Sequence, residues 1–156
     1  MRDEPEDDKI ERSSVADTPA YMKADELPWT PWVTKGLFFK LISVDMSTGG
    51  FSVFLKVLPG HHLPTHGLGG SLEGIVLAGS FGVDDAVSKK GDFFFDYGGS
   101  FQQPLSEEGC TLFLSCGGPL FGLDAETGAT VPIDARLIYD IASAAGVADH
   151  IETPFD

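Results

Sequence analysis

Short apolar runs separated by glycine-containing turns recur along the chain and constrain its fold more than any other feature. The runs are rich in Phe, Val, Leu and Ile, which favour strands. Strands joined by tight turns are therefore predicted, and many short strands favour an antiparallel sandwich or barrel. The clearest runs are GLFFKLISV (36–44), GFSVFLKVLPG (50–60), the segments 63–66 and 72–83, GDFFFDYGG (91–99), CTLFLSC (110–116) and PLFGLD (119–124).

Only the carboxy-terminal region has the signals of a helix. Asp134 follows Pro132 and is predicted to be the N-cap, and Gly146 is predicted to end the helix. One face of this helix would carry Leu137, Ile138, Ile141 and Ala145. By contrast, the segment DDAVSKKG (84–91) is predicted to be a polar turn.

Length and charge narrow the class of protein. A chain of 156 residues predicts one domain, with an acidic, flexible N-terminal arm over residues 1–26 and the domain over 27–156. The net charge of −14 opposes nucleic-acid binding, which depends on clustered Lys and Arg. No apolar run approaches the roughly 18 residues of a membrane span. The polar N-terminus lacks a signal peptide, so we expect a cytoplasmic protein with no membrane partner.

The two cysteines lie on one predicted strand. Cys110 and Cys116 are six positions apart in CTLFLSC, and six strand steps span roughly 20 Å, far beyond the reach of a disulfide. We expect both to be free thiols in the core.

Chemistry-bearing residues are concentrated in the stretch GHHLPTHGLGGSLEGIVLAG, from Gly60 to Gly79. It contains three histidines, six glycines and one glutamate. Its pattern predicts a strand, a glycine-rich turn and a second strand, with polar side chains gathered between them. Whether this hairpin holds a metal is the main functional question.

The glycine spacing of this stretch resembles the first motif of the cupin superfamily. That motif runs G, five residues, H-x-H, three or four residues, E, six residues, G. Here Gly60 is followed by five residues and His66, and Gly79 comes one residue early when Glu73 is taken as the acidic residue. The second motif, G, five residues, P-x-G, two residues, H, resembles the stretch from Gly91 to Gln102.

The resemblance extends over roughly residues 26 to 150, to small single-domain cupins that cleave diketones and hydroxy-ketones, such as the acetylacetone and 2,4'-dihydroxyacetophenone dioxygenases. It is carried by ELPWTPWVTKGLFFKLISVDMSTGGFSVFLKVLPG, FLSCGGPLFGLDAETG and the closing helix. It implies an all-β, single-domain jelly-roll barrel with a short C-terminal helix. In that family three histidines, sometimes with a glutamate, hold Fe(II) or a similar metal.

At the ligand positions this chain departs from the family. His66 matches the first histidine and Glu73 the acidic residue, whereas Leu68 and Gln102 stand where the second and third histidines should be. Leucine has no lone pair to donate, and a neutral amide is a poor ligand for Fe(II) or Zn(II). We therefore expect no cofactor. If a metal were bound, its ligands would be His66, Glu73 and Gln102, with His62 as a further candidate.

The residues that remain suit metal-independent acid–base chemistry. His66 or Glu73 would abstract a proton next to a carbonyl, with burial raising the pKa of Glu73, and Gln102 would donate its amide N–H to the enolate oxygen. Isomerisation, cyclisation, dehydration or decarboxylation of a small apolar carbonyl or polyketide-like compound would fit. The residues expected to line the substrate pocket are Leu68, Phe54, Tyr97, Phe113 and Trp32.

Two other functions stay open. One is an Fe-dependent dioxygenase that cleaves a diketone or an aryl ketone, as the resemblance implies. The other is a non-catalytic cupin that binds a small molecule. The resemblance and the exposed strand edges also lead us to expect a homodimer.

Overall fold

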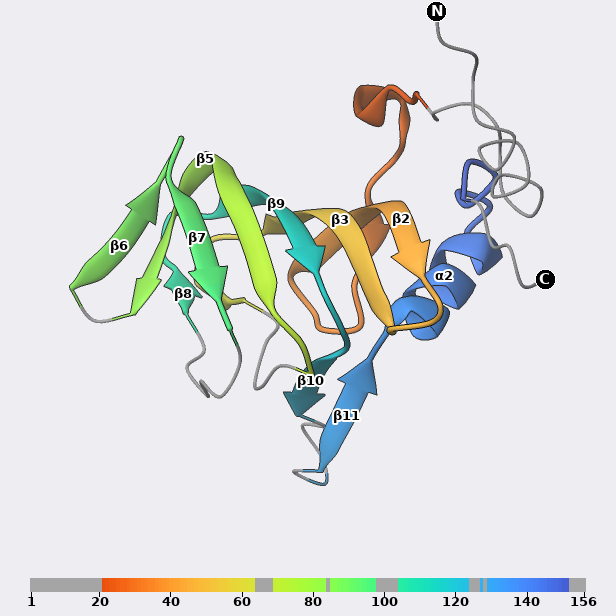
Figure 1. Cartoon of the computed structure of the whole chain (residues 1–156). Helices are drawn as coiled ribbons and strands as arrows, with labels where there is room; N and C mark the ends of the chain where they lie inside the picture. Colours follow the sequence, from red (N-terminus) through yellow and green to blue (C-terminus); the bar gives the residue numbers. More distant parts are fainter. Residues whose placement is uncertain are drawn as a thin grey trace, which may run out of the picture.

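The computed structural model describes residues 21–63, 69–83, 85–97, 104–123, 127 and 129–151. Figure 1 shows a curled sheet with one α-helix beside it. A short 3-10 helix, η1, comes first, and an α-helix, α2, follows the last strand. The elements are η1 (Ala24–Glu26), β1 (Thr30–Pro31), β2 (Leu37–Asp45), β3 (Gly50–Val57), β4 (His61–His62), β5 (Leu72–Val83), β6 (Ala86–Lys89), β7 (Phe93–Asp96), β8 (Leu105–Ser106), β9 (Cys110–Cys116), β10 (Leu120–Leu123), β11 (Thr130–Ile133) and α2 (Ala135–Ala144).

Within the described residues, nine strands form one antiparallel sheet. Its order is β1-β2-β3-β9-β5-β8-β4, and β6 and β7 also pair with β5. The strands β10 and β11 form a separate pair, which lies below the main sheet in Figure 1. The predicted all-β barrel-like fold with a short C-terminal helix is confirmed.

The longest described strand, β5, pairs with different strands along its first and last parts. Its first part, residues 72–79, pairs with β9 and in part with β7. Its last part, residues 80–83, pairs with β6, and Gly82 also pairs with Leu105 of β8. Gly79 lies where the strand passes from one set of partners to the other, with a φ of 73°. A left-handed backbone of this kind favours glycine.

Side chains alternate between two faces of the sheet, as strand geometry requires. We call the face that packs into the hydrophobic core the inner face, and the opposite one the outer face. The register aligns the inner-face residues of three adjacent strands in rows. The rows are Phe51–Cys116–Leu72, Val53–Leu114–Gly74 and Leu55–Leu112–Val76.

The C-terminal helix closes one side of the core beside β2 (Figure 1). Asp134 is its N-cap, as predicted, and the Asp134 side chain accepts a hydrogen bond of 2.9 Å from the backbone N–H of Leu137. Gly146 follows the C-cap residue Ala145 with a φ of 77°. The buried helix residues are Ala135, Ile138 and Ala142, while Leu137 and Ile141 pack against the core from its edge.

One local prediction is wrong, and two others are tested only in part. The segment 84–91 contains a strand, because β6 (Ala86–Lys89) pairs with the last part of β5. Of the strand predicted at 63–66, the structure describes Leu63 alone, which follows the two-residue β4 (His61–His62), and residues 64–66 lie outside the described part. Residues 24–26 of the predicted flexible arm form η1, and Lys40 donates a 2.9 Å hydrogen bond to the Ala24 carbonyl. No described helix is long and apolar enough to cross a membrane.

Candidate functional site

The predicted site residues are divided between described and undescribed segments. His66, Leu68 and Gln102 lie outside the described residues, so their proposed roles stay predictions. Glu73, which the first cupin motif assigns to the same site, is described. Its position on β5 can therefore be compared with that of its neighbours.

Glu73 lies on the outer face of the sheet. Its side chain is exposed, whereas the adjacent Leu72 is 7% exposed and belongs to the core. Glu73 is registered with Ser115 on one side and with Phe95 on the other. The expectation that Glu73 is buried toward the barrel interior is therefore wrong. A catalytic role for this carboxylate stays untested.

The position of Leu72 explains why the motif spacing was one residue short. When the motif is counted back from Gly79, residues 73–78 fill its six-residue spacer. Leu72 then stands at the acidic position of the motif. Three residues, 69–71, then separate Leu68 from Leu72, which also satisfies the motif. The inner-face position that an acidic residue would occupy thus holds leucine.

By motif position, the donor set expected from the sequence is incomplete for a cupin metal centre. Leu68 and Leu72 occupy two of the ligand positions, and neither side chain can coordinate a cation. In the described part of the chain, no three His, Cys, Asp or Glu residues lie close enough to hold a metal ion. His66 and Gln102 are the remaining polar residues at ligand positions.

Three of the predicted pocket residues lie on the outer face. Phe54 and Phe113 are half-buried neighbours on β3 and β9, with ring centroids 5.5 Å apart. Tyr97, just after β7, is 85% exposed, and its ring lies 4.2 Å from that of Phe95. The structure places Phe54 beside Phe113 and Tyr97 beside Phe95, all on the outer side of the sheet.

Trp32 is the predicted pocket residue that lies in the core. It is 5% exposed and packs edge-on against Phe39, with ring centroids 5.4 Å apart. Its ring also lies 6.2 Å from that of Phe51, which shares a register row with Cys116 and Leu72. Trp32 therefore packs at the Phe51 end of the inner-face row whose other end is Leu72.

The indole N–H of Trp32 is a buried polar group in this region. Its Nε1 atom is buried and has no hydrogen-bond acceptor among the described residues. Buried polar groups are nearly always paired, and leaving one unpaired costs about 1–3 kcal/mol. The sequence led us to predict Trp32 as a pocket residue, and it contains no signal for the missing acceptor of its indole N–H.

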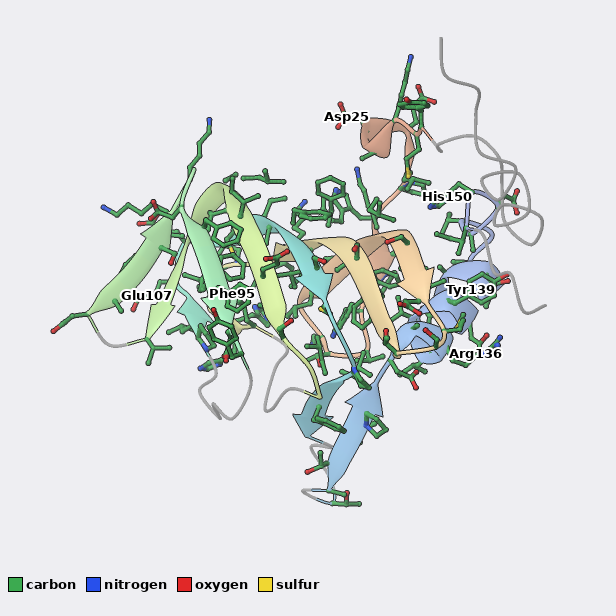
Figure 2. The ribbon with its side chains drawn as sticks, viewed as in Figure 1. Asp25, Phe95, Glu107, Arg136, Tyr139 and His150 are labelled. Carbon is green, nitrogen blue, oxygen red and sulfur yellow. The ribbon has the colours of Figure 1, made fainter. Side chains whose placement is uncertain are left out.

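The described histidines do not gather around Trp32. His62 on β4 is exposed, and the Nδ1 atom of His61 lies 3.2 Å from the Pro59 carbonyl oxygen. His150, which the sequence did not single out, lies after α2 (Figure 2), and its Nε2 atom is 2.6 Å from the Leu41 carbonyl oxygen. These contacts hold loop segments against strands, and no signal in the sequence predicts the His150 contact.

A depression of about 750 Å³ is lined by residues other than the predicted site residues that the structure describes. It is bounded by the last part of β5, by β6 and by the end of β8, near the labelled Glu107 in Figure 2. Its lining mixes apolar residues with both signs of charge: Phe81, Val87, Lys89, Lys90, Leu105 and Glu107. The depression is open and mixed in polarity, so it lacks the apolar lining typical of a small-molecule pocket.

Both cysteines are free and buried at the ends of β9, as predicted. Burial raises the pKa of the Cys116 thiol to about 12. Burial also raises the pKa of Cys110, and a hydrogen bond with Ser106 partly opposes this effect. A thiol held in its neutral form is a weak nucleophile, so these residues are packing groups.

Comparison with known structures identifies the fold. An RmlC-like cupin protein from Ralstonia eutropha JMP134 is 20% identical, with 86% of this chain and 91% of that chain covered and a TM-score of 0.73. An acetylacetone dioxygenase from Acinetobacter johnsonii is 14% identical, with 83% and 93% covered and a TM-score of 0.68. At such low identity the likeness concerns the fold alone.

A third similar structure is the anti-sigma factor ChrR of Rhodobacter sphaeroides, in complex with SigE. It is 18% identical, with 59% of this chain and 50% of that chain covered and a TM-score of 0.50. No curated protein matches the sequence. A family model described as the ChrR cupin-like domain matches residues 17–119. Since this match covers more than half of the chain, the protein belongs to the ChrR cupin-like domain family.

Proposed function

We propose that this cupin binds a small, largely apolar compound inside the barrel and that an oxygen of the ligand accepts a hydrogen bond from Trp32. The observation that carries the proposal is the buried Nε1 donor of Trp32, which lacks an acceptor among the described residues. A carbonyl oxygen would supply that acceptor in surroundings that are otherwise apolar. Ligand sites commonly combine an apolar lining with a few such polar groups.

The surroundings of Trp32 favour a flat or short apolar ligand. Phe39 and Phe51 present aromatic rings to it, and Leu72 occupies the inner-face position of the acidic ligand. A charged ligand would lose its hydration there without gaining an opposite charge from these residues. A neutral carbonyl compound loses less hydration free energy. One hydrogen bond from the Trp32 indole N–H would compensate for the lost hydration of its oxygen.

The two enzymatic alternatives require more functional side chains on the inner face than ligand binding does. An Fe-dependent dioxygenase needs a set of donor side chains, and Leu68 and Leu72 interrupt that set. In the acid–base alternative either His66 or Glu73 is the base, and Glu73 lies on the outer face. His66 and Gln102 alone would have to supply both the base and the oxyanion donor. Binding requires neither arrangement and is therefore the better supported function.

The two tryptophans allow a direct test by NMR. The chain contains Trp29 and Trp32 only, so ¹⁵N-labelled protein gives two indole N–H signals. The probes are acetylacetone, the diketone named in the A. johnsonii enzyme, and acetophenone. We expect a saturable downfield shift of the Trp32 signal. Trp29→Phe removes the other signal and serves as the matched control.

Trp32→Phe keeps an aromatic ring and removes the donor. Since a hydrogen bond contributes about 0.5–1.5 kcal/mol, this change should weaken ligand binding up to about tenfold. Absence of any shift of the Trp32 signal with either probe would contradict the proposal. Turnover of a probe without metal would favour acid–base catalysis, and oxygen uptake that depends on added iron would favour a dioxygenase.

A further inference from the structure

An apolar row crosses the outer face of the sheet. The register aligns Lys40 with Phe54, Phe54 with Phe113, Phe113 with Ile75, and Ile75 with Phe93. These residues belong to β2, β3, β9, β5 and β7, so the row spans five neighbouring strands. A lysine stands at one end, and the four following positions are apolar.

The β5–β7 end of this row is open to solvent. Phe93 is 64% exposed and Ile75 is 36% exposed. Leu77 and Phe95, on the same face beside the row, are 39% and 42% exposed, and Figure 2 shows Phe95 next to β7. Contiguous exposed apolar groups of this kind mark interaction surfaces in soluble proteins.

Two opposite charges lie diagonally across the centre of the row. Lys56 is one strand away from Phe113 on β3, aligned with Thr111, two residues before Phe113 on β9. Glu73 is one strand away on the other side, on β5, aligned with Ser115, two residues after Phe113. Phe113 is thus midway between a positive and a negative side chain.

Both charges are available to a partner. The Nζ atom of Lys56 lies 5.7 Å from the centroid of the Trp29 ring, a contact that leaves its N–H donors free to bind a carboxylate. Glu73 is exposed and makes no hydrogen bond or ion pair with any residue that the structure describes. The Lys40 amine is held differently, because it donates to the Ala24 carbonyl.

We propose that this outer face is the interface between two copies of the chain, related by a twofold axis that passes between their Phe113 rings. A twofold interface uses the same surface on both copies and must be complementary to itself. Because Lys56 and Glu73 lie on opposite sides of Phe113, an axis that lies in the interface plane and is perpendicular to the line between these two residues brings each Lys56 to the partner's Glu73. The apolar rows of the two copies then cross at Phe113, between the two ion pairs. This proposal is independent of the ligand proposed above.

The size of the face sets the expected strength of the dimer. Five strands about 4.8 Å apart and about six residues of each strand, at about 3.3 Å per residue, make a face of about 400 Å² per copy. Stable interfaces commonly bury about 800 Å² per partner, and smaller ones are transient. The net charge of −14 per chain adds long-range repulsion. We therefore expect a reversible dimer whose population rises with concentration.

Sedimentation velocity of the full-length chain over a wide concentration range tests the interface. Phe93→Asp puts a charge on the exposed row and should weaken dimerisation at least about tenfold, equivalent to about 1.4 kcal/mol. Val87→Asp is the matched control, since Val87 is 52% exposed on β6, outside the row. A chain that is monomeric throughout, or a dimer weakened equally by both changes, overturns the proposal.

Charge reversal tests the pairing itself. Lys56→Glu and Glu73→Lys should each weaken the dimer, because each places like charges opposite one another. The double variant exchanges the two charges and should recover most of the loss. Circular dichroism of all three variants checks that folding is unchanged. Losses that simply add in the double variant contradict the pairing of Lys56 with the partner's Glu73.

A cysteine at the axis tests the symmetry. Equivalent residues of the two copies face each other at a twofold axis, so Phe113→Cys should give a covalent dimer with a short bis-maleimide cross-linker, which spans the distance of about 10 Å between packed sheets that a direct disulfide cannot. The natural cysteines are buried and do not compete. Val87→Cys is the control and should stay largely monomeric. Equal cross-linking of both variants, or none with Phe113→Cys while the wild type dimerises, overturns the proposed axis.

Discussion

Leu72 and Glu73 are adjacent on β5 but face opposite sides of the sheet, with Leu72 in the core and Glu73 in solvent. In a family whose first motif places an acidic ligand at this point of the strand, one step along the backbone decides whether a carboxylate lies inside the barrel. Here leucine has the inner position. The carboxylate instead contributes to an outer face that carries apolar side chains.

The two adjacent residues should respond very differently to truncation. Leu72→Ala removes buried methyl groups from a packed core and should lower the free energy of unfolding by about 2–5 kcal/mol. Glu73→Ala alters an exposed residue and should change the free energy of unfolding by no more than about 0.5 kcal/mol. Urea denaturation at low protein concentration, where the chain is monomeric, measures both. Equal losses would contradict the assignment of the two faces.

Gly79 should tolerate no side chain. A Cβ atom there would collide with the Gly109 carbonyl oxygen, and the φ of 73° is strained for other residues. Gly60 has a similar φ of 84°, but a Cβ would meet nothing within 4 Å. Thermal unfolding should show a modest loss for Gly60→Ala, about 1 kcal/mol. Gly79→Ala should lose clearly more or fail to fold, and similar losses would contradict the close approach.

The buried thiol of Cys116 should make stability fall at alkaline pH. Its pKa is about 12 in the folded chain against an ordinary 9.0, so the unfolded state releases its proton first. The stabilisation is complete below pH 9.0 and is lost as pH rises toward about 12. At a pH of about 10 the loss should be about 1.4 kcal/mol.

Cys116→Ala is the comparison for this effect. The substitution leaves a small cavity, which shifts stability equally at every pH, but it removes the titrating group. Denaturant unfolding at pH values from about 8 to about 10 should therefore show a shallower fall for the variant. Parallel curves for the two proteins would show that the Cys116 thiol is not the group responsible.

The N-cap of α2 should be replaceable only by residues with a similar acceptor. Asp134→Ala removes the 2.9 Å hydrogen bond to the Leu137 N–H and should lower the free energy of unfolding by about 1 kcal/mol. Asp134→Asn keeps an acceptor oxygen and should lose much less. Chemical denaturation compares the two. A similar loss in both variants would mean that the negative charge near the helix N-terminus matters more than the cap.

Much of the fold could be predicted because glycine turns and apolar runs are local signals. The core strands, the Asp134 cap and the free cysteines follow from residue type and spacing. The strand β6 was missed because Ser88 and Lys89 are polar and lie at an exposed edge, where pairing with β5 outweighs their weak strand preference.

The candidate site was harder to predict because the face of each residue is not a local signal. In GFSVFLKV both faces carry apolar residues, so the sequence could not show that Phe54 lies outside while Phe51 and Val53 lie inside. The placement of Glu73 failed for a related reason. A motif counted from His66 and one counted from Gly79 differ by one residue, and one residue changes the face.

The passage of β5 between two sets of partners has a consequence for how the molecule unfolds. Residues 72–79 are bonded to β9 and β7, and residues 80–83 to β6 and β8, yet all belong to one continuous strand. Separation of the strands at one end of the barrel therefore also removes hydrogen-bonded neighbours of β5 that hold the other end. We therefore expect the domain to lose its structure in a single cooperative transition, in which amide protons on both sides of Gly79 exchange through the same opening.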